Sequence, residues 1–433
     1  MQHKTVIIPS IDIMNGSAVQ LRQGRDHVLD GGDPFERLEE FSLVGEVAVV
    51  DLDAALGKGS NRDIIAKMAR LKPIRVGGGI RNEDTAHFWL DAGAAKIMIG
   101  TKATAEFCSV LPKERIIAAV DAREGKFVTH GWTHDTNDTV TDKIRELAPF
   151  VDGFLFTQVE REGMMQGFDM EAVNEAIRAA GNARVVAAGG ITTTADIATL
   201  DRLGADAQVG MALYSEALDL GDAVAECLHK PLAGDIWPTV VCDESGKNLG
   251  IVWSTRESLK MAIRKRRGIY WSRSRNEIWE KGKTSGNTQE LLDVRLDCDR
   301  DALRFTVKQA GTGFCHTGRR ACWDSTNEFS LDELEAIIAE RMSNPKPNSG
   351  TTKLLSNPVL LEKKLLEEAG ELAAATTKPE ARHEAADLLY FLLVAARKQG
   401  VTFADIQNEL RLRNLRVSRR AMESKEARNG DSA

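Results

Sequence analysis

Short apolar runs alternate with longer amphipathic or polar segments through the first half of the chain. The order of the runs is VIIPSI, VAVVDL, IRVGGG, KIMIGT, RIIAAV, GFLFTQ, RVVAAGG and AQVGMA. Runs of this length indicate strands, and the segments between them indicate helices. Eight β–α units predict a closed (β/α)8 barrel, or TIM barrel, over residues 1–230. An open, doubly wound sheet is the alternative.

An internal repeat supports the closed barrel. The stretch IDIMNGSAVQ, which contains Asp12, recurs as VDAREGKFVT, which contains Asp121. The glycine pair Gly78-Gly79 recurs as Gly189-Gly190. Two half-barrels that descend from one duplicated ancestor explain this pattern simply.

The alternation stops after the barrel. Residues 231–328 are rich in Trp and Arg and contain the strand-like stretches PTVVCD, LGIVWS and RFTVKQ. They predict a mainly-β α+β domain. Residues 329–433 show helical periodicity, interrupted by the polar stretch NPKPNSGTTK, and predict an all-α domain. The final stretch ESKEARNGDSA is expected to be disordered.

Composition excludes several classes of protein. The content of 42% hydrophobic and 28% charged residues is ordinary for a folded cytosolic protein. The net charge of −7 argues against nucleic-acid and membrane-surface partners. No apolar run reaches the roughly 20 residues that span a bilayer, and the N-terminal stretch lacks the apolar core of a signal peptide. With only six cysteines, the chain is expected to be cytoplasmic and free of a disulfide framework.

Two aspartates are candidates for acid–base chemistry in the barrel. Asp12 and Asp121 follow equivalent strands, at the end of the barrel where active sites lie. Paired carboxylates at that place suit the removal and donation of protons. Helix capping or a loop salt bridge is the alternative interpretation.

The repeated glycine pairs indicate phosphate binding. Gly78 and Gly79 follow one strand, and Gly189 and Gly190 follow its counterpart. Such loops expose backbone N–H groups at helix starts and can hold phosphate, although one loop alone also fits a tight turn. Two loops at symmetric places predict a ligand with a phosphate at each end.

The barrel segment resembles the isomerase of histidine biosynthesis that acts on a bis-phosphorylated aminoimidazole carboxamide ribotide. The motifs IIPSIDIMNGSAVQLRQG, VVDLDAALG, VGGGIRN, VDAREGK and AAGGI carry the resemblance. It implies conversion of an aminoaldose to an aminoketose without a cofactor, with Asp12 and Asp121 as acid and base. Asp169 matches a further family aspartate, and Gly210 matches a glycine of the second phosphate loop.

Two positions depart from this family. The family's Asp-Gly-Thr stretch is replaced by Glu162, Gly163 and Met164, so the threonine that assists catalysis is missing. The basic residue after Gly210 is replaced by Met211. A thioether supplies neither a strong hydrogen bond nor a charge. Two hypotheses follow: the barrel is an isomerase, or it is a non-catalytic binding or scaffolding module.

The stretch LDCDRD places three aspartates close together in the middle segment. If it is a strand, Asp297, Asp299 and Asp301 share one face and Cys298 points to the other. Three carboxylates on one face suit Mg²⁺, which prefers oxygen ligands.

Three cysteines of the middle segment are candidate zinc ligands. Cys298, Cys315 and Cys322 supply three thiolates, which leave a fourth zinc position open for water. Buried or unpaired thiols are the alternative. His316 is a candidate general base or ring-nitrogen contact, with a supporting hydrogen bond to a ligand as the alternative role.

The middle segment resembles the phosphoribosyl-AMP cyclohydrolases through WSRSRNEIWEKGKTSGN, RLDCDRD and GTGFCHTGRRACW. The resemblance implies hydrolytic opening of the adenine six-membered ring by zinc-bound hydroxide. It also implies a homodimer, because the zinc cysteines of this family come from two chains. The sequence lacks the His-x-Glu and Pro-Cys-x-x-Cys pattern of base deaminases, which argues against ordinary nucleobase deamination. The expected phosphate and ribose contacts are Arg273, Arg275, Lys283, Ser285 and Asn287.

Acidic residues recur at helical spacing in the last segment. Glu368 and Glu371 share one helical face, with Glu367 alongside, and Glu384 and Asp387 have the same spacing on the next helix. A solvated face is the common explanation for one such pair. The second pair runs into the apolar stretch LLYFLLVAA, so these acids are expected to be buried and to bind Mg²⁺.

This segment resembles the all-helical phosphoribosyl-ATP pyrophosphohydrolases, through SGTTKLLSNPVLLEKKLLEEAGEL and ARHEAADLLYFLLVAARKQG. The resemblance implies binding of an ATP-derived nucleotide and Mg²⁺-assisted attack of water that releases pyrophosphate. A general nucleotide pyrophosphatase is the alternative. The three resemblances name consecutive steps, which predicts a multifunctional enzyme of histidine biosynthesis that acts on phosphoribosyl nucleotides.

Overall fold

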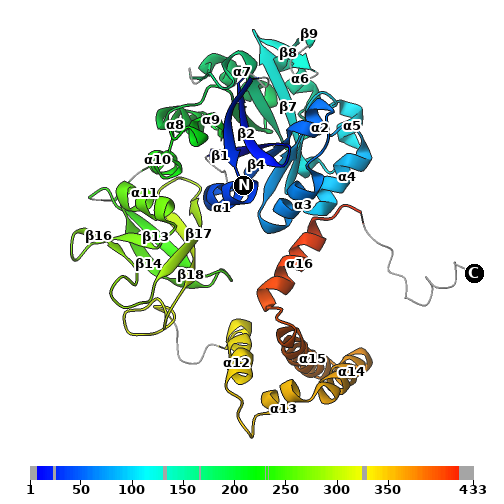
Figure 1. Ribbon diagram of the computed structural model, residues 1–433, viewed down its shortest axis with the longest axis vertical. Helices are drawn as coiled ribbons and strands as arrows, with labels where there is room; N and C mark the ends of the chain where they lie inside the picture. The colour runs from blue at the N-terminus through cyan, green and yellow to red at the C-terminus, as the bar shows by residue number, and fades with distance from the viewer. Residues whose placement is uncertain are drawn as a thin grey trace, which may run out of the picture. The chain divides into compact units, whose positions relative to one another are not determined.

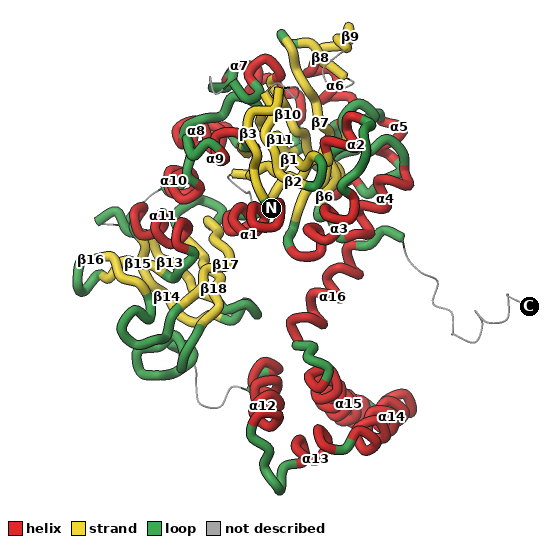
Figure 2. The backbone as a smooth tube through the Cα atoms, viewed as in Figure 1, coloured by secondary structure: helices red, strands yellow, loops and turns green. Residues whose placement is uncertain are grey.

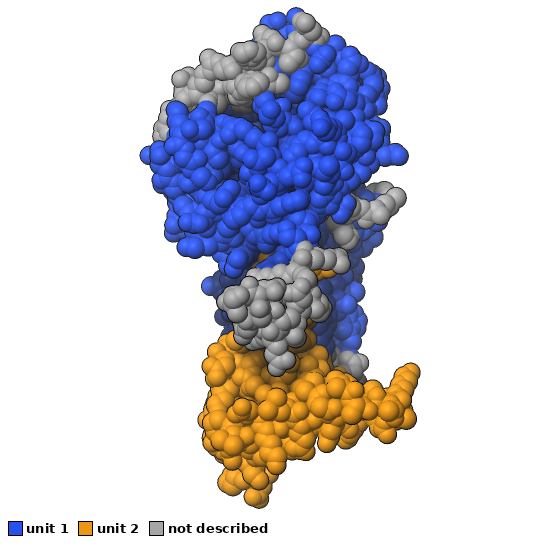
Figure 3. Space-filling model, turned by 90° about the vertical axis from the view of Figure 1, so that its right-hand side faces the viewer, with its two compact units in different colours: residues 1–323, 415–433 blue, residues 324–414 orange. Residues whose placement is uncertain are grey.

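The computed structural model describes residues 7–22, 26–129, 134–164, 167–229, 231–232, 234–323 and 329–418. The chain forms two compact units, coloured separately in Figure 3. The first comprises Met1–Trp323 and Leu415–Ala433, and the second comprises Asp324–Asn414. The stretch expected to be disordered, 423–433, lies outside the described residues. Among the described residues, no helix combines the length and the apolar character needed to cross a bilayer.

Eight parallel strands close into a barrel in the first unit (Figure 1). The first strand pairs with both the second and the last, and each of the others pairs with its two neighbours in the chain. The closed barrel is therefore confirmed, and all eight predicted runs form its strands. They are β1 (Ile7–Met14), β4 (Val47–Asp51), β5 (Ile74–Gly77), β6 (Lys96–Ile99), β7 (Ile116–Arg123), β10 (Gly153–Gln158), β11 (Arg184–Ala188) and β12 (Asp206–Val209).

Helices surround these strands, and Figure 2 shows the helical layer outside the sheet. Strand side chains that point outward pack against the apolar faces of the helices, while a smaller apolar cluster fills the barrel interior. The helices are α1 (Pro34–Phe41), α2 (Leu52–Leu56), α3 (Arg62–Leu71), α4 (Glu83–Ala92), α5 (Ala105–Ser109), α6 (Val140–Leu147), α7 (Met170–Ala180), α8 (Thr194–Leu203), α9 (Met211–Tyr214) and α10 (Leu220–Glu226), with 3-10 turns η1 (Ser42–Val44), η2 (Lys113–Arg115) and η3 (Val159–Arg161).

The internal repeat of the sequence is also a repeat of structure. β1 continues through an antiparallel extension made of β2 (Ser17–Arg22) and β3 (Asp26–Gly32). β7 continues in the same way through β8 (Lys126–Thr129) and β9 (His134–Thr139). Both extensions begin with a turn of two residues that have positive φ, which is the geometry of a tight hairpin.

The middle of the chain forms a six-stranded sheet with one helix, α11 (Arg256–Lys265). This confirms the predicted mainly-β segment. The strand order is β16-β15-β14-β13-β18-β17, and only β13 and β18 run parallel among the neighbours in this sheet. The strands are β13 (Trp237–Cys242), β14 (Asn248–Ser254), β15 (Ile269–Ser272), β16 (Glu277–Glu280), β17 (Gln289–Leu296) and β18 (Leu303–Gln309).

The regular elements described in the second unit are all helices, as predicted (Figure 2). Its core is small and contains Ile338, Leu354, Leu361, Leu393 and Val394. The polar stretch after the first helix forms a loop over 344–349, but its end already belongs to the next helix. The helices are α12 (Leu331–Ser343), α13 (Gly350–Ser356), α14 (Pro358–Ala374), α15 (Lys378–Lys398) and α16 (Phe403–Leu415), whose last residue belongs to the first unit.

Candidate functional sites

A cavity of about 320 Å³ lies at the end of the barrel where the strands have their carboxyl ends. Asp12 on β1 and Asp121 on β7 both line it, so the structure brings together the two aspartates that the repeat singled out. Ion pairs such as Glu46–Arg75 and Lys96–Asp152 lie at the opposite end of the strands. The candidate acid–base residues therefore lie at the end of the barrel where active sites of this fold usually lie.

Glu162 adds a third carboxyl group to the same cavity. Burial raises the pKa of Asp12 to about 7. Burial, followed by the charges of Asp12 and Asp121, raises the pKa of Glu162 to about 7 as well. Sequence reasoning treated Glu162 only as a departure from a family motif. The sequence did contain a signal for a role of Glu162 in the cavity, because this carboxylate comes soon after the barrel strand β10.

The glycine pairs form tight turns against neighbouring strand ends. Gly78 has φ +94°, and a Cβ there would lie 2.2 Å from the carbonyl oxygen of Asp51. Gly189 has φ +90°, and a Cβ there would lie 2.6 Å from the carbonyl oxygen of Gln158. Only glycine fits such a backbone. The two loops are structurally equivalent, which is what a ligand with two similar ends requires.

The surroundings of the two loops differ. Gly78 and Gly79 line the main cavity together with Arg81 and Lys102. Gly189 and Gly190 line a smaller cavity of about 40 Å³ with Gly210 and Met211. No lysine or arginine is found among the described residues that line the smaller cavity. Any anion there would be held by backbone N–H groups and not by a basic side chain.

Asp169 lies outside the cavity that contains Asp12, whereas Gln208 lines it. Asp169 is the exposed N-cap of α7, and its carboxylate accepts hydrogen bonds from the N–H groups of Glu171 and Ala172. It does not line the cavity that contains Asp12. Gln208 on β12 does, and its buried Oε1 has no hydrogen-bond partner among the described residues. Such an atom can accept a hydrogen bond from a ligand.

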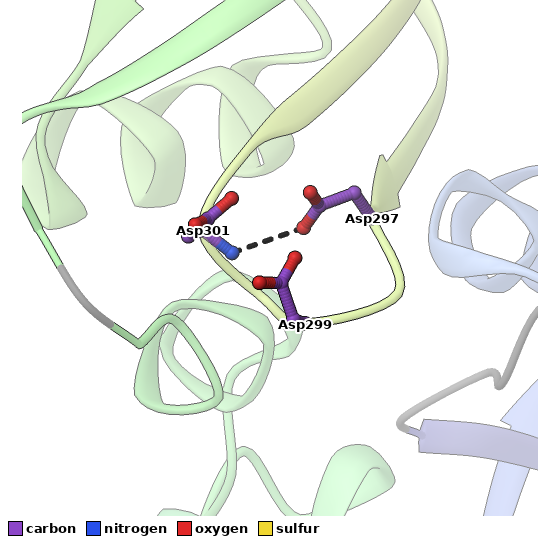
Figure 4. Close-up of side chains that lie close together, drawn as sticks. All are labelled: Asp297, Asp299 and Asp301. Carbon is purple, nitrogen blue, oxygen red and sulfur yellow. Dashed lines mark hydrogen bonds between the residues drawn. The ribbon is translucent and has the colours of Figure 1, made fainter.

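The predicted strand over LDCDRD is wrong, although its aspartates do gather. β17 ends at Leu296, and the following residues form a turn in which Arg300 has φ +64°. The carboxylate of Asp297 accepts a hydrogen bond from the N–H group of Asp301 at 2.9 Å (Figure 4). It accepts another from the N–H group of Ala302 at 3.1 Å. These bonds favour a turn over an extended backbone.

The turn nevertheless places one carboxylate oxygen of each aspartate within 4.8 Å of the others. Asp297, Asp299 and Asp301 form this aspartate turn (Figure 4). A set of carboxylate oxygens so close together fits a hard divalent cation. The three aspartates therefore gather as expected, but through a turn and not through a strand face, and their role as Mg²⁺ ligands stays a prediction.

The thiols of Cys315 and Cys322 lie together in the loop after β18. Hydrogen bonds from Thr317, and then from Cys322, lower the pKa of the Cys315 thiol to about 7. Lys281, which sequence reasoning missed, is buried beside the two thiols, and its ammonium group lies 5.5 Å from the ring centre of Phe314. The ready ionisation of Cys315 suits a metal ligand.

Cys298 lies in the aspartate turn and is exposed. Within the described part of the chain, the two sets of three ligand atoms that come within 4.8 Å are both made of carboxylates. Cys298, Cys315 and Cys322 are therefore not gathered as one set by a single chain. The exposed His316 has its Nδ1 atom 4.0 Å from the Cys315 sulfur, which is at the outer limit for a hydrogen bond that involves sulfur.

The predicted phosphate contacts lie on the exposed loops around β16. The guanidinium of Arg273 stacks on Trp253 at 4.1 Å, and Arg275 pairs with Glu277 at 3.1 Å. Asn287 accepts a hydrogen bond from the N–H of Thr312 at 2.9 Å, which ties its loop to the segment that leads to Cys315. Lys283 and Ser285 are exposed in the same loop.

The second unit gathers Glu368, Glu371 and Glu384, whose oxygens lie within 4.8 Å of one another. They come from facing positions on α14 and α15. Glu368 is buried, and Glu371 is exposed. Desolvation and the neighbouring carboxylates of Glu371 and Glu368 raise the pKa of Glu384. Acids that repel one another in this way can be stabilised by a divalent cation.

Two further predicted ligands lie beside this cluster. Glu367 accepts a hydrogen bond from Lys364 at 2.9 Å, and Asp387 lies 3.5 Å from His383. Asp387 and Glu384 were expected to be buried, but the side chain of Asp387 is 45% exposed and Glu384 is only half-buried. The expectation was wrong because the helices that contact α15, namely α12, α13 and α14, leave these two acids partly open to solvent.

Comparisons with known proteins divide the chain into three matched segments. The family described as histidine biosynthesis protein matches residues 6–219. Phosphoribosyl-AMP cyclohydrolase matches residues 251–324, and phosphoribosyl-ATP pyrophosphohydrolase matches residues 331–414. An imidazole-4-carboxamide isomerase of Methanocaldococcus jannaschii is 36% identical over 233 residues, which are 51% of this chain and 98% of the relative. The chain belongs to this histidine-biosynthesis family.

The joining of these three segments in one chain makes it similar to fungal multifunctional proteins. The histidine biosynthesis trifunctional protein of Saccharomyces cerevisiae is 42% identical over 190 residues, which are 44% of this chain and 24% of the relative. The histidine biosynthesis bifunctional protein of Schizosaccharomyces pombe is 38% identical over 210 residues, which are 48% of this chain and 50% of the relative. The chain thus spans about a quarter to a half of these fungal relatives.

Each candidate site falls inside one matched domain of this fusion. The cavity with Asp12 and Glu162 belongs to the histidine-biosynthesis barrel. The aspartate turn and the paired thiols belong to the cyclohydrolase domain. The cluster around Glu368 belongs to the pyrophosphohydrolase domain. Domains of the two hydrolase families typically use metal ions, and these two domains imply phosphoribosyl nucleotide substrates.

Proposed function

We propose that this chain catalyses two successive hydrolytic steps of histidine biosynthesis. The helical unit converts phosphoribosyl-ATP to phosphoribosyl-AMP and pyrophosphate, and the middle domain then opens the adenine ring of phosphoribosyl-AMP. The observation that carries this proposal is the joining of both matched domains in one chain, each with its own cluster of candidate ligands.

Magnesium is the proposed ion for the two carboxylate clusters. Oxygen ligands at short mutual distances suit this hard cation. In the helical unit, Glu368, Glu371 and Glu384 would hold it, with Glu367 and Asp387 alongside. The ion would neutralise phosphate charge, while nearby carboxylates orient the attacking water.

Zinc is the proposed ion for the thiols. Cys315 and Cys322 supply two ligands, and Cys298 of a second copy would supply the third, so the active form is a homodimer. Two exposed apolar residues support a partner at this place: Trp323, next to Cys322, is 57% exposed, and Ile251 is 49% exposed. Bound zinc would supply hydroxide near neutral pH. His316, together with Arg273 and Arg275 on the exposed loop before β16, would position the nucleotide.

We also favour isomerase activity over a scaffolding role for the barrel. Isomerisation of an aldose to a ketose needs a base that removes the proton from carbon 2 and an acid that donates a proton elsewhere. Asp12, Asp121 and Glu162 line one cavity together with the first glycine pair, and Glu162 also lines the smaller cavity with the second pair. Glu162 stands two residues before Met164, which replaces the family's threonine. The carboxyl group of Glu162 can supply a proton that the thioether of Met164 cannot.

Separate assay of the three steps on the purified full-length chain tests this proposal. Cys315→Ser is expected to lose both zinc and the cyclohydrolase step while the other two steps continue. Full cyclohydrolase activity in a protein that contains no zinc by elemental analysis would contradict the assignment.

Asp12→Asn serves the same purpose for the barrel. It is expected to abolish turnover of the bis-phosphorylated ribotide and to leave both hydrolytic steps unchanged. Absence of turnover by the unmodified chain, with both hydrolases active, would favour the scaffolding role.

Substrate preference tests the alternative that the helical unit is a general nucleotide pyrophosphatase. Phosphoribosyl-ATP is expected to react much faster than ATP, GTP, CTP or UTP. Equal rates for all of these nucleotides would remove the pathway assignment of this unit.

A further inference from the structure

The aspartate turn of the cyclohydrolase domain is bound to the barrel through Arg300. This arginine lies within the turn, between Asp299 and Asp301. Its guanidinium Nη2 lies 2.8 Å from the carboxylate Oδ1 of Asp201, near the end of barrel helix α8. The side chains of Arg300 and Asp201 are only 7% and 8% exposed. The pair is thus a buried connection between two domains of the first unit.

The backbone of Arg300 is held by the same junction. Its carbonyl oxygen accepts a hydrogen bond from the N–H of His229, at 2.7 Å. The carbonyl of His229 in turn accepts a hydrogen bond from the indole of Trp237, also at 2.7 Å, and Trp237 is buried at the start of β13. Both ends of the arginine are therefore fixed, one to α8 and one to the segment that joins the domains.

Arg300 needs this support because of its backbone conformation. Its φ of +64° is a left-handed conformation that non-glycine residues rarely adopt without compensating contacts. The residues on both sides of it are candidate ligands. If the ion pair is lost, relaxation of φ at Arg300 would move the carboxylates of Asp299 and Asp301 apart and weaken the hydrogen bonds that Asp297 accepts.

We propose that Asp201 of the barrel is a positioning residue for the divalent-cation site of the cyclohydrolase domain. The inference rests on the proposed function, in which the aspartate turn holds Mg²⁺. Asp201 does not touch the ion. It fixes Arg300, and Arg300 fixes the turn, so the barrel contributes to the hydrolytic step whether or not its own cavity is active.

Asp201→Asn tests the inference, because it removes the charge and keeps the size of the side chain. The matched control is Asp219→Asn. Asp219 also forms an ion pair across this junction, with Arg264 at 2.9 Å, but it does not contact the aspartate turn. Asparagine can still cap α10 at that position.

The first measurement is hydrogen–deuterium exchange in the metal-free full-length chain. Asp201→Asn is expected to accelerate exchange at the N–H groups of Asp301 and Ala302, and Asp219→Asn is expected to leave it unchanged. Unchanged exchange in Asp201→Asn, or equal acceleration in both variants, would overturn the positioning role. Asp201→Ser, which also removes the charge, provides a second variant should the asparagine protein fail to fold, and the same two results support or overturn the positioning role.

The second measurement is the Mg²⁺ concentration that gives half-maximal cyclohydrolase activity. Asp201→Asn is expected to raise it about tenfold or more, as is usual when a group that orients a metal ligand is removed. The Mg²⁺ dependence of the pyrophosphohydrolase step should stay the same. Faster exchange with an unchanged Mg²⁺ requirement would overturn the assignment of the cation to this turn, and so the proposed function on which the inference rests.

Discussion

Asp12 and Glu162 share one cavity and lose their protons in the same range. Burial raises the pKa of each to about 7. Near neutral pH the cavity can therefore hold a carboxylic acid and a carboxylate at the same time, which is the combination that acid–base catalysis requires. The charge of Asp121 also raises the pKa of Glu162.

The raised pKa values predict how stability depends on pH. In the unfolded chain these groups ionise near their ordinary pKa values of 3.8 and 4.5. Between those values and about pH 7, the folded chain keeps protons that the unfolded chain has lost. The free energy of unfolding should therefore fall as the pH rises through this window.

Thermal melts of the full-length chain check this expectation. The double variant Asp12→Asn and Glu162→Gln cannot titrate at either position, so the melting temperature of its first unit should fall less steeply between about pH 4 and 7. Identical slopes for this variant and the unmodified chain would mean that the two groups ionise normally.

Sequence reasoning succeeded for residues that the repeat marks and failed for residues that depend on the path of a loop. Asp12 and Asp121 were found because they follow equivalent strands. Glu162 reaches the cavity only because the chain turns back after β10, and neither periodicity nor spacing reports that turn. Lys281 was missed for the same reason, since its burial beside Cys315 depends on the folding of two separate loops.

At the scale of the element, the glycine turns show how closely the barrel strands and loops are packed. Gly78 and Gly57 both have positive φ, +94° and +69°. A Cβ at Gly78 would collide with the backbone of Asp51, whereas a Cβ at Gly57 would meet nothing within 4 Å. The pair separates the effect of backbone strain from that of steric collision.

Gly78→Ala is therefore expected to destabilise the first unit much more than Gly57→Ala does. The left-handed backbone alone should cost about 1–2 kcal/mol in either variant, and the collision adds to this at Gly78. Chemical denaturation of the two proteins checks the order. Equal losses would show that the loop at Gly78 can move away from Asp51.

The elements also show where periodicity stops being informative. It identified all eight barrel strands, because each contains a short apolar run that is distinct from the longer amphipathic or polar segments between the runs. It missed the extensions β2–β3 and β8–β9, in which buried apolar residues such as Val19 and Val128 are mixed with polar ones. On α15 it identified an apolar face correctly, but periodicity cannot tell whether another chain covers that face. Leu392 on this helix is 40% exposed.

At the scale of the whole molecule, the three domains use different chemistry. The two clusters of three close ligand atoms among the described residues both lie in the hydrolase domains, and the described barrel cavity depends on carboxyl groups and glycine loops. The three activities should therefore respond differently when metal ions are removed.

Treatment with EDTA followed by gel filtration is expected to stop both hydrolytic steps and to leave the isomerisation intact. Addition of Mg²⁺ alone should restore the pyrophosphohydrolase step, while the cyclohydrolase step should need Zn²⁺ as well. Elemental analysis accompanies each assay. Loss of isomerisation on chelation would contradict the cofactor-free mechanism of the barrel.

The Arg300–Asp201 pair also constrains how the gene can evolve. A gene fission that released the middle domain as a separate protein would expose a formerly buried arginine and leave the aspartate turn without its support. A viable descendant would need a compensating substitution at Arg300 in the same lineage. Recombination that exchanged the barrel for one without an acidic residue at this place would meet the same barrier, so the two domains are expected to be inherited together.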